Sequence, residues 1–239
     1  MRKKIYSSII LLFLLIFSCG NVSGQQDLPA LSDREKMTLQ RLGGKLDKNG
    51  NIFLRGITID RRTKEIAFPA VTNIREGTIE VIITTEIGRT HESLFITQID
   101  PFLLQLSLIL AGYRNGPVES TKQLRAGDAF DLIVKLKNGQ EENAERWLYN
   151  ATKKKDVKSG GLIFIGSNFL NGECMASKEG NLIDINSNDE NSILCMKLPQ
   201  EELKSEFIAV TDRIVKPGKD GVEEVAVTLI LRPKKEKVK

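Results

Sequence analysis

The segment whose residues are best suited to catalysis or binding lies around His91, the only histidine of the chain. A histidine next to a carboxylate, here Glu92, can act as a general base or begin a metal site. In an extended strand consecutive side chains point to opposite faces, so His91 and Glu92 converge only if the backbone turns here. The candidate binding residues are Arg89, Thr90, His91, Glu92 and Ser93.

Other familiar catalytic arrangements are missing from the sequence. With one histidine, a zinc site would need carboxylates or water as its remaining ligands, which is uncommon. Ser93 is too close in sequence to His91 for the two to be assigned to a serine-hydrolase catalytic triad, and there is no G-x-S-x-G elbow. Walker and dinucleotide motifs do not occur. The segment is open to a structural, a binding or a catalytic role, with His91 and Glu92 as the catalytic candidates; we assign no metal and no cofactor.

Cys174 and Cys195 flank a turn-prone stretch that runs from Asn186 to Asn191. In an oxidising compartment these two cysteines would form a disulfide, which stabilises a fold by roughly 3 kcal/mol in the chain-entropy model. Two buried thiols are an alternative. A metal or redox site is a third, although there is no C-x-x-C spacing to favour it.

The compartment follows from the first two dozen residues, where Arg2, Lys3 and Lys4 precede an apolar run and together form a secretory leader. Two cleavage sites remain open. Cleavage before Cys19 removes residues 1–18 and leaves a lipidated cysteine on a membrane. Cleavage after Gly24 removes residues 1–24 and releases a chain that begins at Gln25. We therefore expect an exported protein that is periplasmic or a membrane-anchored lipoprotein.

The net charge of +4 is largely a property of the leader. Without its three basic residues, and with no acidic residue lost, the chain has 32 Lys and Arg against 31 Asp and Glu. Lysines crowd the basic tail, residues 234–239, and such terminal runs are usually solvated. We expect no nucleic-acid partner, and membrane contact only through a lipid on Cys19.

The elements that position these residues are predicted from periodicity and capping. A capping-box spacing at Ser32 begins a short helix that ends near Leu42. Alternation predicts strands over 56–60, 65–68 and 78–85, joined as an antiparallel meander. An almost wholly apolar helix follows at about 100–112, capped by Asp100. Later strands are expected at 129–137, 144–149, 161–166, 173–177, 182–185, 193–197, 207–211 and 222–231.

These elements predict an α+β fold, mainly antiparallel sheet packed against one buried central helix at about 100–112. Residues 25–50 form an N-terminal helix and linker, and residues 51–233 form a single domain. We prefer one domain although the lysine-rich stretch 153–161 could divide two lobes.

Several segments together resemble the YdjY-domain family of exported bacterial proteins. The similar segments are 57–60, 66–71, 88–95, the helix from Asp100 to Gly112, Arg146-Trp147 and 164–167. The resemblance spans about 52–233 and implies an envelope location, but the family has no established activity to carry across. Some relatives are described as ferredoxin-like through cysteine-rich segments, which this chain lacks.

We expect an exported, non-enzymatic binding or accessory module that uses the segment 89–93 to contact an envelope protein or a small ligand. One alternative is a metal-assisted hydrolase that combines His91 with Glu92, Asp60 or Asp100. Another is an accessory to an envelope redox system, with Cys174 and Cys195 cycling between thiol and disulfide.

Overall fold

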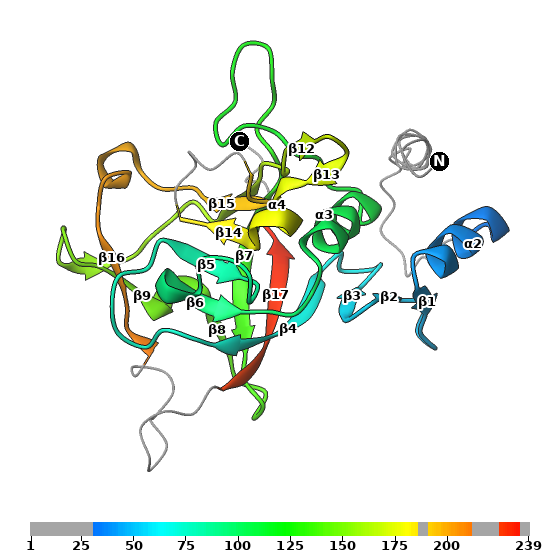
Figure 1. Ribbon diagram of the computed structural model, residues 1–239, viewed down its shortest axis with the longest axis horizontal. Coiled ribbons are helices and arrows are strands. Elements are labelled where there is room, and N and C mark those ends of the chain that lie inside the picture. Colours follow the sequence, from blue (N-terminus) through cyan, green and yellow to red (C-terminus); the bar gives the residue numbers. More distant parts are fainter. Residues whose placement is uncertain (1–30, 186–190, 212–224, 235–239) are drawn as a thin grey trace, which may run out of the picture.

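The computed structural model describes residues 31–185, 191–211 and 225–234 (Figure 1). The leader, Cys19 and most of the basic tail lie outside the described residues, as does the beginning of the strand expected at 222–231. None of the helices in the described ranges has the length and apolar character needed to cross a bilayer.

The central element is a closed barrel of eight strands in one twelve-stranded sheet. Its strands, in spatial order, are β4 (Ile66–Thr72), β17 (Ala226–Pro233), β7 (Ala129–Lys135), β11 (Leu162–Phe164), β15 (Leu194–Met196), β14 (Asn181–Asp184), β5 (Val81–Thr84) and β6 (Ser93–Ile96). The ring closes where β6 pairs with β4. Two of its pairs, β14–β15 and β5–β6, are parallel and the others are antiparallel.

The remaining strands extend or flank this barrel. Three antiparallel strands continue the sheet beyond β4, and β8 extends it beside β7; these are β1 (Gly44–Leu46), β2 (Ile52–Leu54), β3 (Ile57–Ile59) and β8 (Glu141–Asn143). A separate three-stranded sheet contains β10 (Lys155–Asp156), β9 (Leu148–Asn150) and β16 (Phe207–Ala209). A small hairpin is formed by β12 (Phe169–Leu170) and β13 (Glu173–Cys174).

The helices in the described part of the chain are short. The α-helices are α2 (Asp33–Arg41), α3 (Pro101–Leu110) and α4 (Met175–Glu179), and the 3-10 helices are η1 (Thr90–Glu92), η2 (Ala144–Trp147) and η3 (Gln200–Glu202). The expected helices near 32–42 and 100–112 are confirmed. Asp100 caps α3 by accepting from the Phe102 N–H at 2.9 Å.

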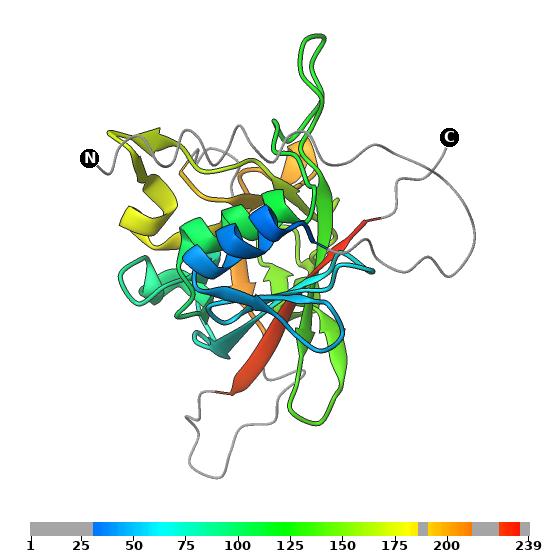
Figure 2. The ribbon, with the colours of Figure 1, turned by 90° about the vertical axis from the view of Figure 1, so that its right-hand side faces the viewer.

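The predicted fold class is wrong, because the sheet closes on itself instead of packing on a central helix. The helix α3 is buried, but it contacts β3 and α4 at one side of the molecule (Figures 1 and 2). Ten helical residues cannot cover a sheet of this size. Closure pairs the strand edges and lets the inward side chains cover one another.

Alternation along the long strands shows the barrel interior. In β17, Val227, Leu229 and Leu231 are buried and Ala226 and Thr228 are exposed, although Ile230, on the other face, is buried as well. The same alternation places Phe130, Leu132 and Val134 of β7 in the one large hydrophobic cluster of the described residues.

Three local predictions are wrong. The expected meander fails because β5 pairs with β14 and β6 and does not pair with β4. The return strand expected at 144–149 begins as η2, which carries Trp147, and becomes β9 only at Leu148. The strand expected at 173–177 ends at Cys174, and α4 begins at Met175.

Candidate functional site

The segment around His91 is a turn between two parallel barrel strands, β5 and β6. It contains η1, so the backbone bends where His91 and Glu92 follow one another. Gly88 lies so close to its neighbours that a Cβ there would be 2.0 Å from Thr84 Oγ1. Glycine is therefore required for this turn to pack against β5.

Hydrogen bonds to Asn181 at the start of β14 and to Gly180 before it hold the beginning of the turn. The Arg89 N–H donates to Asn181 Oδ1 at 3.3 Å, and the Thr84 hydroxyl donates to the Gly180 carbonyl at 2.9 Å. Thr84 and Asn181 are both buried, so these contacts are shielded from water. The backbone position of Arg89 is thereby fixed relative to two barrel strands.

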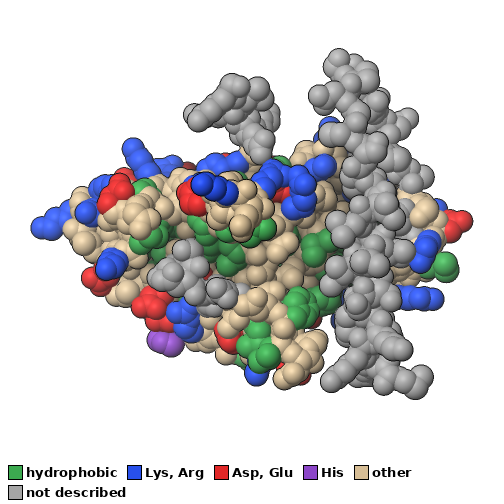
Figure 3. Space-filling model, turned by 90° about the horizontal axis from the view of Figure 1, so that it is seen from above, with side chains coloured by type: hydrophobic (Ala, Val, Ile, Leu, Met, Phe, Trp, Pro, Cys, Tyr) green, Lys and Arg blue, Asp and Glu red, His purple; other side chains and the backbone are tan. Residues whose placement is uncertain are grey.

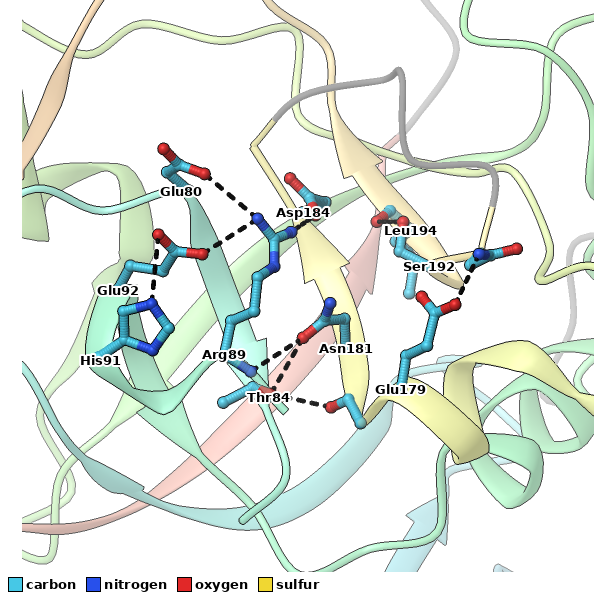
Figure 4. Close-up of polar contacts among 12 residues, drawn as sticks. Glu80, Thr84, Arg89, His91, Glu92, Glu179, Asn181, Asp184, Ser192 and Leu194 are labelled. Atoms are coloured by element: carbon cyan, nitrogen blue, oxygen red, sulfur yellow. Dashed lines mark hydrogen bonds and ion pairs between the residues drawn. The ribbon is translucent and has the colours of Figure 1, made fainter. Parts of the chain in front are cut away.

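The Arg89 guanidinium contacts three carboxylates (Figure 4). Nη1 lies 3.2 Å from Glu80 Oε2 and 3.1 Å from Glu92 Oε1, and Nη2 is ion-paired with Asp184. The Asp184 side chain is only 3% exposed, whereas those of Glu92 and Glu80 are 19% and 58% exposed. Arg89 thus bridges a buried acid and two acids nearer the surface.

His91 projects from this braced turn. Its side chain is 79% exposed, and its Nε2 lies 3.8 Å from Glu92 Oε2. The side chains of His91 and Glu92 therefore converge, as the sequence predicted they would if the backbone turned here. In Figure 4 the imidazole lies on the outer side of Glu92, away from Asp184.

Ser93 has a different environment from His91. It is fully buried at the start of β6, and its hydroxyl accepts from Asn73 Nδ2 at 3.0 Å. The same amide donates to the carbonyls of Thr90 and Ser93. Ser93 and the Thr90 carbonyl therefore anchor the turn, whereas the His91 side chain is exposed.

The structure does not bring the other proposed metal ligands to His91. Asp60 accepts from the N–H groups of Arg62 and Thr63 in its own turn, each at 2.8 Å. Asp100 caps α3 and accepts from the Ser177 hydroxyl at 2.8 Å. Within the ranges that the structure describes, no three His, Cys, Asp or Glu side chains gather as a metal site would require.

The two cysteines are separate buried thiols in the structure, Cys174 in β13 and Cys195 in β15. Burial, together with the nearby Asp184 charge, raises the pKa of Cys195 to about 12. Because the thiolate is the nucleophile in disulfide exchange, this environment opposes redox cycling at Cys195.

A small cavity lies elsewhere, against η2 and β11. Its volume is about 10 Å³, close to the minimum that one water needs. Its polar lining residues include Asn143, Glu145 and Ser159, and the Ser159 hydroxyl donates to Glu145. This cavity has no room for an organic ligand.

Sequence reasoning missed Asn73, Glu80, Asn181 and Asp184, which hold the candidate turn in place. One signal was available: Asp184 follows Leu182 and Ile183 directly in an expected strand, and a charged side chain in such a buried run requires a partner. The identity of that partner, Arg89, depends on strand order, which the sequence did not supply.

No protein-family model, curated protein or solved structure matches the chain. The resemblance to the YdjY-domain family therefore stays a prediction.

Proposed function

We propose that the protein is an exported binding or accessory module of the cell envelope that contacts its partner through the turn from Arg89 to Glu92. The observation that supports this proposal is a contrast within one turn. His91 is 79% exposed, while Arg89 and Glu92 are held by ion pairs. A side chain presented from an ordered backbone binds with a small loss of conformational entropy.

The charges around the turn favour a partner group that is positively charged. The carboxylates of Glu80, Glu92 and Asp184 outnumber the single guanidinium that they surround. Glu80 is the most exposed of the three and can accept a charge-assisted hydrogen bond from a lysine, an arginine or an amine. His91 offers a ring nitrogen at the edge of the same surface.

Site-specific photo-crosslinking in the cell that makes the protein tests this proposal. A photoreactive amino acid at position 91 should give an adduct of defined mass, and Glu80→Gln in the same chain should weaken it. The matched control position is Gln140, which is exposed in the turn between β7 and β8. Identical adducts from both positions, or none from position 91, would contradict a specific contact at the turn.

A stability measurement separates binding from a structural role. The His91 side chain is largely in water. His91→Ala should therefore change the unfolding free energy by no more than a typical surface substitution, about 0.5 kcal/mol. A larger loss would assign His91 to the packing of the turn.

A further inference from the structure

Two projections carry large hydrophobic side chains that face solvent. Leu124 is 60% exposed in the loop 116–127 between α3 and β7, and Phe169 and Leu170 are 43% and 55% exposed in the hairpin β12–β13. Both projections lie in the upper half of the molecule in Figures 1 and 2, where the loop is the highest point and the hairpin lies lower and to one side. Single exposed apolar side chains are ordinary, but two apolar projections at one end indicate an interaction surface.

The loop that carries Leu124 is braced by its own hydrogen bonds. The Thr121 N–H donates to the Leu124 carbonyl at 2.8 Å, and Thr121 Oγ1 accepts from the Leu124 N–H at 2.9 Å. At the base, the Gly127 N–H donates to the Pro117 carbonyl at 3.1 Å. The loop therefore presents Leu124 from a defined turn.

The second projection is also built to present its apolar residues. Phe169 packs edge-on against Phe102 of α3, with ring centroids 6.1 Å apart. The hairpin turns at Asn171 and Gly172, which both have positive φ, as a tight two-residue turn requires. Phe169 is thus partly anchored, and Leu170 beside it is the more exposed of the two.

Positive charge accompanies the apolar tip of the loop. Lys122 and Arg125 lie on either side of Leu124, and the nearest acidic residue before them, Glu119, is ion-paired with Lys197 at 3.0 Å. Arg125 also pairs with Asp128 at 3.0 Å, near the base of the loop. Figure 3 looks down on this end, where hydrophobic and basic side chains reach the surface together with some acidic ones.

We propose that this end of the molecule binds an anionic membrane surface. Leu124 and Leu170 enter the interfacial region, while Lys122 and Arg125 contact the lipid headgroups. Apolar side chains on convex projections insert between headgroups, and flanking basic residues add electrostatic attraction. This contact is independent of the turn at His91 and additional to any lipid on Cys19.

Co-sedimentation with vesicles tests the proposal. The chain is used from Gln25, the expected start after leader cleavage, because the apolar leader would itself bind lipid; every described residue is kept. One vesicle contains phosphatidylglycerol and phosphatidylethanolamine, and the other contains phosphatidylcholine alone. The wild type should bind the anionic vesicles more tightly, and added salt should weaken that binding.

Four variants identify the contact. Leu124→Ser and Leu170→Ser should each weaken binding to the anionic vesicles about tenfold, since each removes an inserted leucine. Lys122→Gln and Arg125→Gln should each weaken it about fivefold. Met37→Ser, at a side chain of α2 that is 52% exposed, is the matched control and should leave binding unchanged.

Three results would overturn the proposal: no binding of the wild type to anionic vesicles, equal binding to both kinds of vesicle, or equal binding by the loop variants and the wild type. Because all four substituted side chains are solvent-exposed, the variants should keep the wild-type melting temperature. The tip residues can therefore be tested without unfolding the barrel.

Discussion

The guanidinium of Arg89 is ion-paired with the carboxylate of Asp184, 95 residues later in the chain. This ion pair holds the turn, which carries His91, against the barrel strand β14. A carboxylate that is 3% exposed loses most of its hydration, so it depends on its partner for compensation. The turn and the barrel are thereby coupled through one pair of charges.

Removing Arg89 should therefore cost more stability than its own exposure suggests. Breaking a buried pair typically costs 3–5 kcal/mol, and because Arg89 is one-third exposed we expect Arg89→Met to cost about 2 kcal/mol. Asp184→Asn should destabilise the wild type but restore part of the loss in the Arg89→Met protein. Urea denaturation of the four proteins gives the coupling energy. Additive losses would mean that the two charges do not depend on each other.

Gly88 should be the least replaceable residue of the turn. A methyl group there would meet Thr84 Oγ1 at 2.0 Å and Asn181 Oδ1 at 2.8 Å, so Gly88→Ala must displace the turn from β5 and β14. We expect a loss of about 2 kcal/mol or more in unfolding free energy, as for other overpacked sites. Thermal unfolding measures this loss.

The matched control for Gly88 is Gly172→Asn. Gly172 has open space around it, and asparagine tolerates its positive φ of 84°. This control should cost about 1 kcal/mol at most, from backbone strain alone. An equally small cost for Gly88→Ala would show that the turn can shift without loss, and would weaken the case for a preorganised site.

Local patterns in the sequence were sufficient for the two longer helices and many strands. Asp100 and Pro101 mark the start of α3, and alternation identifies β4 and β7, because capping and side-chain periodicity are properties of neighbouring residues. The segment around His91 was singled out by residue type alone. These features need no knowledge of which strands pair.

Strand order was beyond the reach of those patterns. The barrel closes through the pairing of β6 with β4 and through parallel contacts of β5 with β6 and of β14 with β15, which join distant segments. In β5, Val81, Ile82, Ile83 and Thr84 are all buried, so alternation along it carries little information about its faces. The partners of Arg89 depend on this order and were missed for the same reason.

Glu202 should make stability depend on pH in the acid range. Its side chain is almost fully buried, is ion-paired with Lys155 and accepts from Asn150 Nδ2 at 3.0 Å. The hydrogen bond with Lys155, with further help from Asn150, lowers the pKa of Glu202 despite its burial. A lowered pKa stabilises the folded state above the unfolded value of about 4.3, and this contribution is lost as the pH falls below that value.

Glu202→Gln should therefore cost about 1–2 kcal/mol at pH 7 and progressively less toward pH 3. Glu201→Gln, at the exposed neighbouring position, is the matched control and should change stability little at either pH. Urea denaturation at several pH values measures both. A difference between wild type and Glu202→Gln that is constant from pH 7 to pH 3 would contradict the assigned ion pair.

Thiol chemistry distinguishes the disulfide predicted from the sequence from the separate thiols of the structure. Cys195 is fully buried beside Asp184, and its raised pKa of about 12 leaves almost no thiolate at pH 8. Native protein from Gln25 should therefore leave Cys195 unmodified by iodoacetamide. Unfolded without a reductant, the chain should show two modified cysteines by mass, and Cys195→Ser should show one. No modification of the unfolded chain would instead support a Cys174–Cys195 disulfide and would contradict the two free thiols of the structure.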